Sequence, residues 1–272
     1  MRKTLTVKMA SALVAVGFGI VTAQAAFIPL GRTNYFQNFN TLPISGKSST
    51  LPPGWAISYP TDKQTEIFAD DGSGTAGRIY SYGNSGSSDR ALGTLRDPTL
   101  NGSMSPMFGA NFQNDTGGAI NRLNISYTGE EWRLGAAGRG PDRLQFQYSL
   151  NAGSLTSGTW INAPALDFLT PNLTGVGAHN GNLAANETQL SSSIGFLNIP
   201  AGATFWVRWV DVAVPGGGPE DGLAVDNFSI SAVPEAQTLA AGFGMTLLLG
   251  FVIWKRTNPV ITISSMLGVG TR

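Results

Sequence analysis

Apolar and polar residues alternate strictly in two stretches of the chain. Residues 143–149 place Leu144, Phe146 and Tyr148 on one face of an extended segment, and residues 123–127 alternate in the same way. Successive side chains of a β-strand point to opposite faces, so a period of two is typical of strands with one buried face. The pattern therefore predicts two half-buried strands of an antiparallel sheet.

Residues 204–212 follow a different pattern, because apolar side chains occupy almost every position. A short run of this kind is typical of a strand that is covered on both faces. Arg208 and Asp211 interrupt the run, and each needs a partner if it is buried.

Clusters of glycine, asparagine, aspartate and serine separate further strand candidates. These candidates are residues 35–39, 55–58, 78–82, 159–162, 191–197 and 223–231. About ten strands with such spacing predict an all-β fold, a two-sheet antiparallel sandwich or jelly roll.

The composition narrows the function classes. The chain has 17 basic and 17 acidic residues, and charged residues make up only 12%. A neutral chain lacks the basic field that gathers nucleic acid, so we expect no nucleic-acid partner. Cysteine is absent. Stability outside the cytosol must therefore come from the core or from bound ions, without any disulfide.

The N-terminus has the three parts of a secretory signal peptide. Three basic residues within residues 2–8 precede an apolar stretch over residues 9–21, and Ala23 and Ala25 form an A-x-A cleavage site. We expect residues 1–25 to be removed by signal peptidase during export.

A second apolar segment, residues 238–254, lies near the C-terminus and ends at Trp254. As a helix it is about 26 Å long, slightly short of the roughly 30 Å hydrocarbon core of a bilayer. Lys255 and Arg256 follow directly, as a basic cluster on the cytoplasmic side does. The segment predicts one transmembrane helix with the preceding domain outside.

The motif Val233, Pro234 and Glu235 precedes this helix. With the apolar run and the basic pair, residues 233–256 resemble the PEP-CTERM sorting signal of Gram-negative bacteria, although Ala236 stands where that signal has a second proline. The resemblance implies an exosortase-type processing enzyme as a partner. It also implies anchoring in the inner membrane during transit, followed by delivery to the cell surface or extracellular matrix. A short extension, residues 257–272, follows and has no assigned role.

Residues 26–232 form one predicted ectodomain. Its segments resemble a secreted bacterial domain that occurs with PEP-CTERM tails and sometimes beside extracellular nuclease modules. The resemblance implies an accessory module and no particular activity. The segments are residues 36–42, 51–55, 88–93, 127–133, 142–149 and 221–228.

Catalysis has weak support in the sequence. The only histidine, His179, lies in a Gly-Ala-His-Asn-Gly segment and is interpreted as a solvated loop residue. Glu130 and Glu131 are adjacent, so on a strand they point to opposite faces and cannot be the carboxylate pair of a glycosidase. We expect no enzyme, with a glycoside hydrolase-like activity as the remote alternative.

Calcium is the more serious chemical candidate. Asp211, Glu220, Asp221 and Asp226 surround the glycine-rich residues 215–219. Carboxylate oxygens from a strand end and a loop are ligands that Ca²⁺ prefers. The alternative is a structural corner without an ion, in which Asp221 caps a turn and Asp226 bonds backbone groups or Arg208.

Sugar binding is the other possibility. Trp132 and Tyr127 are candidates for an aromatic platform against which sugar rings stack. The alternative places them in the core, where aromatic side chains of a sandwich are mostly found.

These observations predict an exported protein of the cell surface or extracellular matrix, a structural or binding β-sandwich without catalysis. The alternative is a carbohydrate-binding module with exopolysaccharide as its partner.

Overall fold

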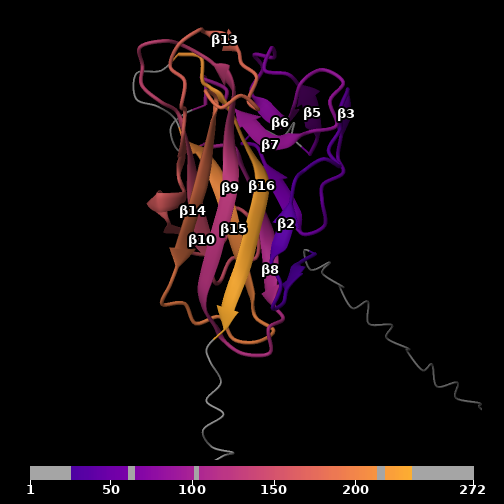
Figure 1. Ribbon diagram of the computed structural model, residues 1–272, viewed down its shortest axis with the longest axis vertical. Coiled ribbons are helices and arrows are strands. Elements are labelled where there is room, and N and C mark those ends of the chain that lie inside the picture. The colour runs from indigo at the N-terminus through magenta and orange to yellow at the C-terminus, as the bar shows by residue number, and fades with distance from the viewer. Residues whose placement is uncertain (1–25, 61–64, 101–103, 213–217, 235–272) are drawn as a thin grey trace, which may run out of the picture.

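The computed structural model describes residues 26–60, 65–100, 104–212 and 218–234 (Figure 1). The predicted signal peptide, the apolar run 238–254 and the extension 257–272 lie outside these ranges. Within them, no helix is long and apolar enough to cross a membrane.

Two sheets pack face to face. The first has seven strands in the order β1-β8-β15-β10-β11, with β4 paired to β8 and β12 paired to β10. Its strands are β1 (Ile28–Leu30), β4 (Trp55–Ser58), β8 (Met107–Asn114), β10 (Arg143–Ser149), β11 (Ile161–Asn162), β12 (Phe168–Leu169) and β15 (Thr204–Val212). A 3₁₀ turn, η1 (Pro164–Leu166), lies between β11 and β12.

The second sheet has nine strands in the order β13-β9-β16-β7-β6-β5-β3, with β14 paired to β9 and β2 paired to β16. Its strands are β2 (Tyr35–Gln37), β3 (Lys47–Ser48), β5 (Ile67–Asp70), β6 (Arg78–Tyr82), β7 (Ala91–Leu95), β9 (Ile120–Leu134), β13 (Gly177–Ala178), β14 (Glu187–Ile194) and β16 (Gly222–Pro234).

The predicted two-sheet sandwich is confirmed, but the sheets are mixed. β1 pairs with β8 in parallel, and so does β5 with β6, whereas the other pairs are antiparallel. The expectation of uniformly antiparallel sheets is therefore wrong at these two pairs. Residues 31–106 separate β1 from β8, which leaves ample chain for the return to the same end of the sheet that a parallel pair requires. Residues 71–77 alone join β5 to β6, so that crossover is unusually short.

Trp209 lies at the centre of the core between the sheets. Its ring stacks on Phe108 with centroids 5.4 Å apart, and it meets Tyr127 and Phe228 of the opposite sheet edge-on at 5.3 Å each. On the outer face of the same strand, Trp206 is buried in a smaller apolar cluster. Residues 204–212 are thus covered on both faces, as the sequence predicts.

The long strands β9 and β16 run side by side between the two ends of the sandwich (Figure 1). We call the end that carries β13 and the segments 83–90, 134–142 and 171–186 the loop end. The opposite end, with the turns 115–119 and 195–203, we call the base.

The last strand extends past the predicted end of the ectodomain. Val233 pairs with Arg122 and Pro234 with Ile120, so two residues of the predicted sorting motif belong to the sheet at the base. Glu235 lies outside the described residues.

Candidate functional site

A buried ionic network closes the loop end around Arg139, which lies between β9 and β10. Its Nη2 lies 2.6 Å from Oδ2 of Asp142 and 3.2 Å from Oδ1 of Asp221, and its Nη1 lies 2.9 Å from Oε2 of Glu220. Arg96 adds a second cation, 3.3 Å from Oε1 of Glu220. Two arginines thus lie among the four buried carboxyl groups of Asp142, Asp211, Glu220 and Asp221.

Hydroxyl and backbone donors extend the network across both sheets. Thr94 on β7 donates to Oδ2 of Asp211 on β15 at 2.7 Å. Thr170, next to β12, donates to Oδ2 of Asp221 at 2.7 Å, and the amide of Gly135 donates to Oδ1 of the same carboxylate at 2.7 Å. The bonds donated by Thr94 and Thr170 cross from one sheet to the other, so the network fastens the two sheets together.

The network also holds unsatisfied carboxylate oxygens. Oδ1 of Asp142 and Oδ1 of Asp211 accept no hydrogen bond. Burial raises the pKa of Asp142 to about 7, and the charge of Asp221 acts in the same direction while Arg139 opposes it. Burial also raises the pKa of Asp211 well above its usual range. Both groups therefore bind protons more tightly than an exposed aspartate does.

The four residues of the predicted calcium site are not all brought together. Asp211, Glu220 and Asp221 belong to the network around Arg139, whereas the charged neighbours of Asp226 are Glu130 and Asp89. Among the described residues, no group of three or more possible ligand side chains has the geometry to hold a metal ion. Residues 213–217, most of the glycine-rich segment, lie outside the described ranges. Arg139 contacts two of the four predicted ligands, Glu220 and Asp221.

Arg208 on β15 and Asp226 on β16 have separate partners. Arg208 donates from Nε to Oε1 of Gln147 at 2.7 Å, and its guanidinium lies 3.7 Å from the centroid of the Trp160 ring. Asp226 accepts a hydrogen bond from the side chain of Asn227 at 2.9 Å. The alternative in which Asp226 bonds Arg208 is therefore not found, because each residue has other partners.

The two residues of the predicted aromatic platform are buried. Trp132 is 1% exposed, stacks on Tyr82 with centroids 6.0 Å apart, and donates from Nε1 to Oε2 of Glu130 at 2.8 Å. Gly181 covers the indole, because a Cβ at that position would lie 2.4 Å from Nε1. Tyr127 packs in the core and donates its hydroxyl proton to the carbonyl of Leu166. Neither ring offers a face to a sugar in this structure.

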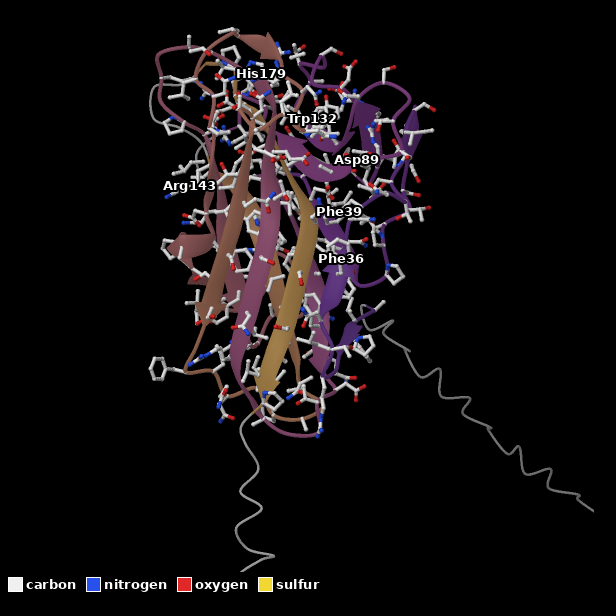
Figure 2. The ribbon with its side chains drawn as sticks, in the orientation of Figure 1. Phe36, Phe39, Asp89, Trp132, Arg143 and His179 are labelled. Atoms are coloured by element: carbon white, nitrogen blue, oxygen red, sulfur yellow. The ribbon has the colours of Figure 1, made fainter. Side chains whose placement is uncertain are left out.

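His179 is held inside the loop end, so its interpretation as a solvated loop residue is wrong (Figure 2). Its Nδ1 lies 2.9 Å from Oε1 of Glu131, and its Nε2 lies 2.7 Å from the carbonyl oxygen of Gly175. A carbonyl only accepts, so Nε2 donates that bond. Burial raises the pKa of Glu131 to about 7. The imidazole thus fixes the segment that carries β13 to β9.

An open cleft lies beside this buried region. Its volume is about 260 Å³, and Asp70, Asp71, Ser73, Ser85 and Arg90 are among the residues that line it. The oxygens of Asp70 are occupied by the amides of residues 72 and 74, at 2.7 to 3.2 Å. Asp71 is exposed, and so are Ser73 and Ser85. The cleft therefore presents a carboxylate and two hydroxyl groups to solvent.

Comparison with known proteins shows no matching family model and no matching curated protein. Among solved structures, the K3 cleaved adhesin domain of Lys-gingipain from Porphyromonas gingivalis w83 is 10% identical, with 72% of this chain and 97% of that chain covered and a TM-score of 0.41. TmCBM61, solved with β-1,4-galactotriose, is 12% identical over 72% of this chain and 95% of that chain, with a TM-score of 0.33. The mannan-recognising carbohydrate-binding module TmCBM27 is 11% identical over 65% and 87%, with a TM-score of 0.34. TM-scores below 0.5 assign neither ligand nor activity to the chain.

The buried carboxyls at the loop end make stability depend on pH. The pKa of Glu130 is raised from 4.5 to about 7 and that of Asp226 from 3.8 to about 8, mainly by burial and then by nearby negative charge. At a pH between the usual and the raised pKa of each group, the unfolded chain has released a proton that the folded chain keeps. Raising the pH through this range therefore favours unfolding. We expect the free energy of unfolding to fall on the order of 2 kcal/mol from about pH 5 to about pH 9.

Urea denaturation across this range measures the fall. Asp226→Asn, which needs no proton, should make the dependence shallower, and Asp115→Asn at the exposed turn 115–119 serves as the control. A wild-type stability that rises steadily with pH would contradict the assignment.

Proposed function

We propose that the protein is an exported structural or binding domain that acts at the cell surface or in the extracellular matrix without catalysis. The observation that carries the proposal is the commitment of acid and base groups to one another at the loop end. Asp142, Glu220 and Asp221 contact Arg139, and Glu131 contacts His179. A general acid or base must reach a substrate proton directly or through one water, which these buried contacts oppose.

The two terminal segments support the proposed location. Residues 1–25 have the features of a signal peptide, and residues 233–256 resemble a sorting signal. Signal peptidase and an exosortase-type enzyme are the proposed processing partners, with the inner membrane as a stage in transit. Because the chain has no cysteine, the exported domain would be stabilised by its core and its ionic network without disulfides.

Intact-mass measurement of the protein recovered from envelope and medium fractions of its native host tests this proposal. We expect a chain that begins at Ala26 and, after sorting, ends near Glu235. A double variant, Pro234→Ala with Glu235→Ala, should keep residues 239–272, because the motif read by the processing enzyme is gone. Recovery of the wild-type chain from the cytosol with both termini uncut would contradict the proposal.

Exopolysaccharide binding is the second candidate, and the cleft lined by Asp70, Asp71 and Arg90 favours it. Charged and hydroxyl groups that converge in a concave site fix hydroxyl-rich ligands by hydrogen bonds. Charge-assisted bonds to the Asp71 carboxylate would supply most of the specificity there.

A glycan array with the full chain tests this candidate. If a polysaccharide binds, Asp71→Ala should weaken it at least about tenfold, equivalent to one charge-assisted hydrogen bond. Glu66→Ala is the matched control, because Glu66 is a neighbouring carboxylate that pairs with Lys47 and does not line the cleft. Failure of every polysaccharide to bind, with and without Ca²⁺, would remove the candidate.

A further inference from the structure

One aromatic side chain at the base covers no part of the fold. Phe196, in the turn between β14 and β15, has a relative exposure of 109%. Its backbone has a φ of 58°, in the left-handed region that bulky residues rarely adopt. A phenylalanine that is strained and also contributes no burial is costly for the isolated domain. Such a residue indicates contact with something outside the described structure.

The position of Phe196 points to the end where the chain leaves the sandwich. The amide of Leu197 donates to the carbonyl of Asn121 at 3.0 Å, which ties the turn to the start of β9. Pro234, the last residue of β16, pairs with Ile120 at the same end of β9. Since β14 and β16 flank β9, the turn and the end of β16 lie about 10 Å apart.

The covalent chain limits how far the base can be from the predicted membrane helix. Three residues separate Pro234 from Thr238, where the apolar run 238–254 begins. Even fully extended, this connection spans at most about 14 Å. The headgroup region on one side of a bilayer is about 5–7 Å thick, so an inserted helix holds the base against the lipid surface.

The base exposes apolar and basic side chains, as a surface that contacts lipid does. Val233 is 39% exposed there, next to exposed Arg122 on the neighbouring strand. Arg32 is exposed beside the turn 115–119, with Asp115 as the acidic residue of that turn. Two apolar side chains flanked by arginines match the interface of a bilayer that contains anionic lipid.

We propose that the base docks on the bilayer in which residues 238–254 are inserted, with the Phe196 ring in the interface between headgroups and acyl chains. This inference rests on the proposed membrane stage of the protein. A second copy of the chain is the weaker occupant, because one phenylalanine and one valine supply far less area than a stable dimer interface. The short connection between Pro234 and Thr238 instead holds the Phe196 ring close to the bilayer.

The absence of cysteine allows a single-site test with the full chain. Gly195→Cys places a spin label beside Phe196 and keeps the ring, and a Cβ at Gly195 has open space around it. The labelled chain is reconstituted into vesicles of phosphatidylethanolamine and phosphatidylglycerol. Electron paramagnetic resonance then compares access of oxygen, which dissolves in lipid, with access of a water-soluble nickel chelate. We expect a severalfold higher oxygen-to-nickel ratio than for a label at Ser85→Cys, at the loop end.

Phe196→Ser in the Gly195→Cys background should abolish this difference while the protein still floats with the vesicles. A label at residue 195 as open to nickel as the one at residue 85, on protein that floats, would overturn the docking and leave the anchor intact. Protein that fails to float would contradict the membrane stage itself, and the docking with it. Shielding that persists in detergent together with spin–spin broadening would assign the surface to a second copy and overturn the proposal.

Discussion

The contacts of Arg139 with Asp142, Asp221 and Glu220 fasten the two sheets at the loop end. Asp142 precedes β10 of the first sheet, whereas Asp221 precedes β16 of the second, so one guanidinium spans the gap between them. Gly135 permits the close approach, because a Cβ there would lie 2.3 Å from the carbonyl oxygen of Glu220. Removing one partner of such a network leaves buried charge uncompensated, which is far more costly than losing a surface pair. In a chain without cysteine, the network holds together segments that a disulfide holds in many exported domains.

This constraint explains why the two ends of the sandwich differ. The loop end uses its carboxylates and its histidine to hold segments 134–142, 171–186 and 218–221 in place. A polar cleft beside Arg90 and a second cleft beside Arg96 and Glu220 remain open there. Among the residues described, the base is held by neutral hydrogen bonds of Asn114 and Thr116 and has no ionic network, and Phe196 and Val233 are exposed at it. In the proposed docking, the polar loop end would point away from the membrane and the base would lie against it.

The sequence predicts the strands whose side chains alternate or are continuously apolar, such as those at residues 143–149 and 204–212. It fails at β8 and β7, where glycine hides the strand pattern. Gly109 and Gly93 face backbone carbonyl oxygens so closely that a Cβ would lie 2.1 and 2.4 Å away, and tertiary contact requires glycine there. β14 is an edge strand with mostly exposed polar residues, so its true span, Glu187–Ile194, differs from the predicted 191–197.

The sequence predicts the acidic residues of the candidate site, but it does not predict that Arg139 lies among them. Asp211, Glu220 and Asp221 stand out because carboxylates gather around a glycine-rich segment. Arg139 lies about eighty positions earlier in sequence than Glu220, and only the pairing of β9 with β16 brings it close. An arginine between glycines in a chain with few charges is the signal that points to it. The burial of Trp132 and His179 depends in the same way on the segment 171–186, whose path no local pattern specifies.

Chemical denaturation of Arg139→Met beside Arg143→Met tests the central claim most directly, because both variants lose the same charge. Arg143 is 42% exposed and lies 3.6 Å from Asp167, so its loss should cost no more than about 1 kcal/mol. The Arg139→Met variant should lose about 3–5 kcal/mol, and the wild-type transition should not shift when EDTA is added, because the cation in the network is a guanidinium. Equal losses for the two variants, or a wild-type stability that depends on Ca²⁺, would contradict the account.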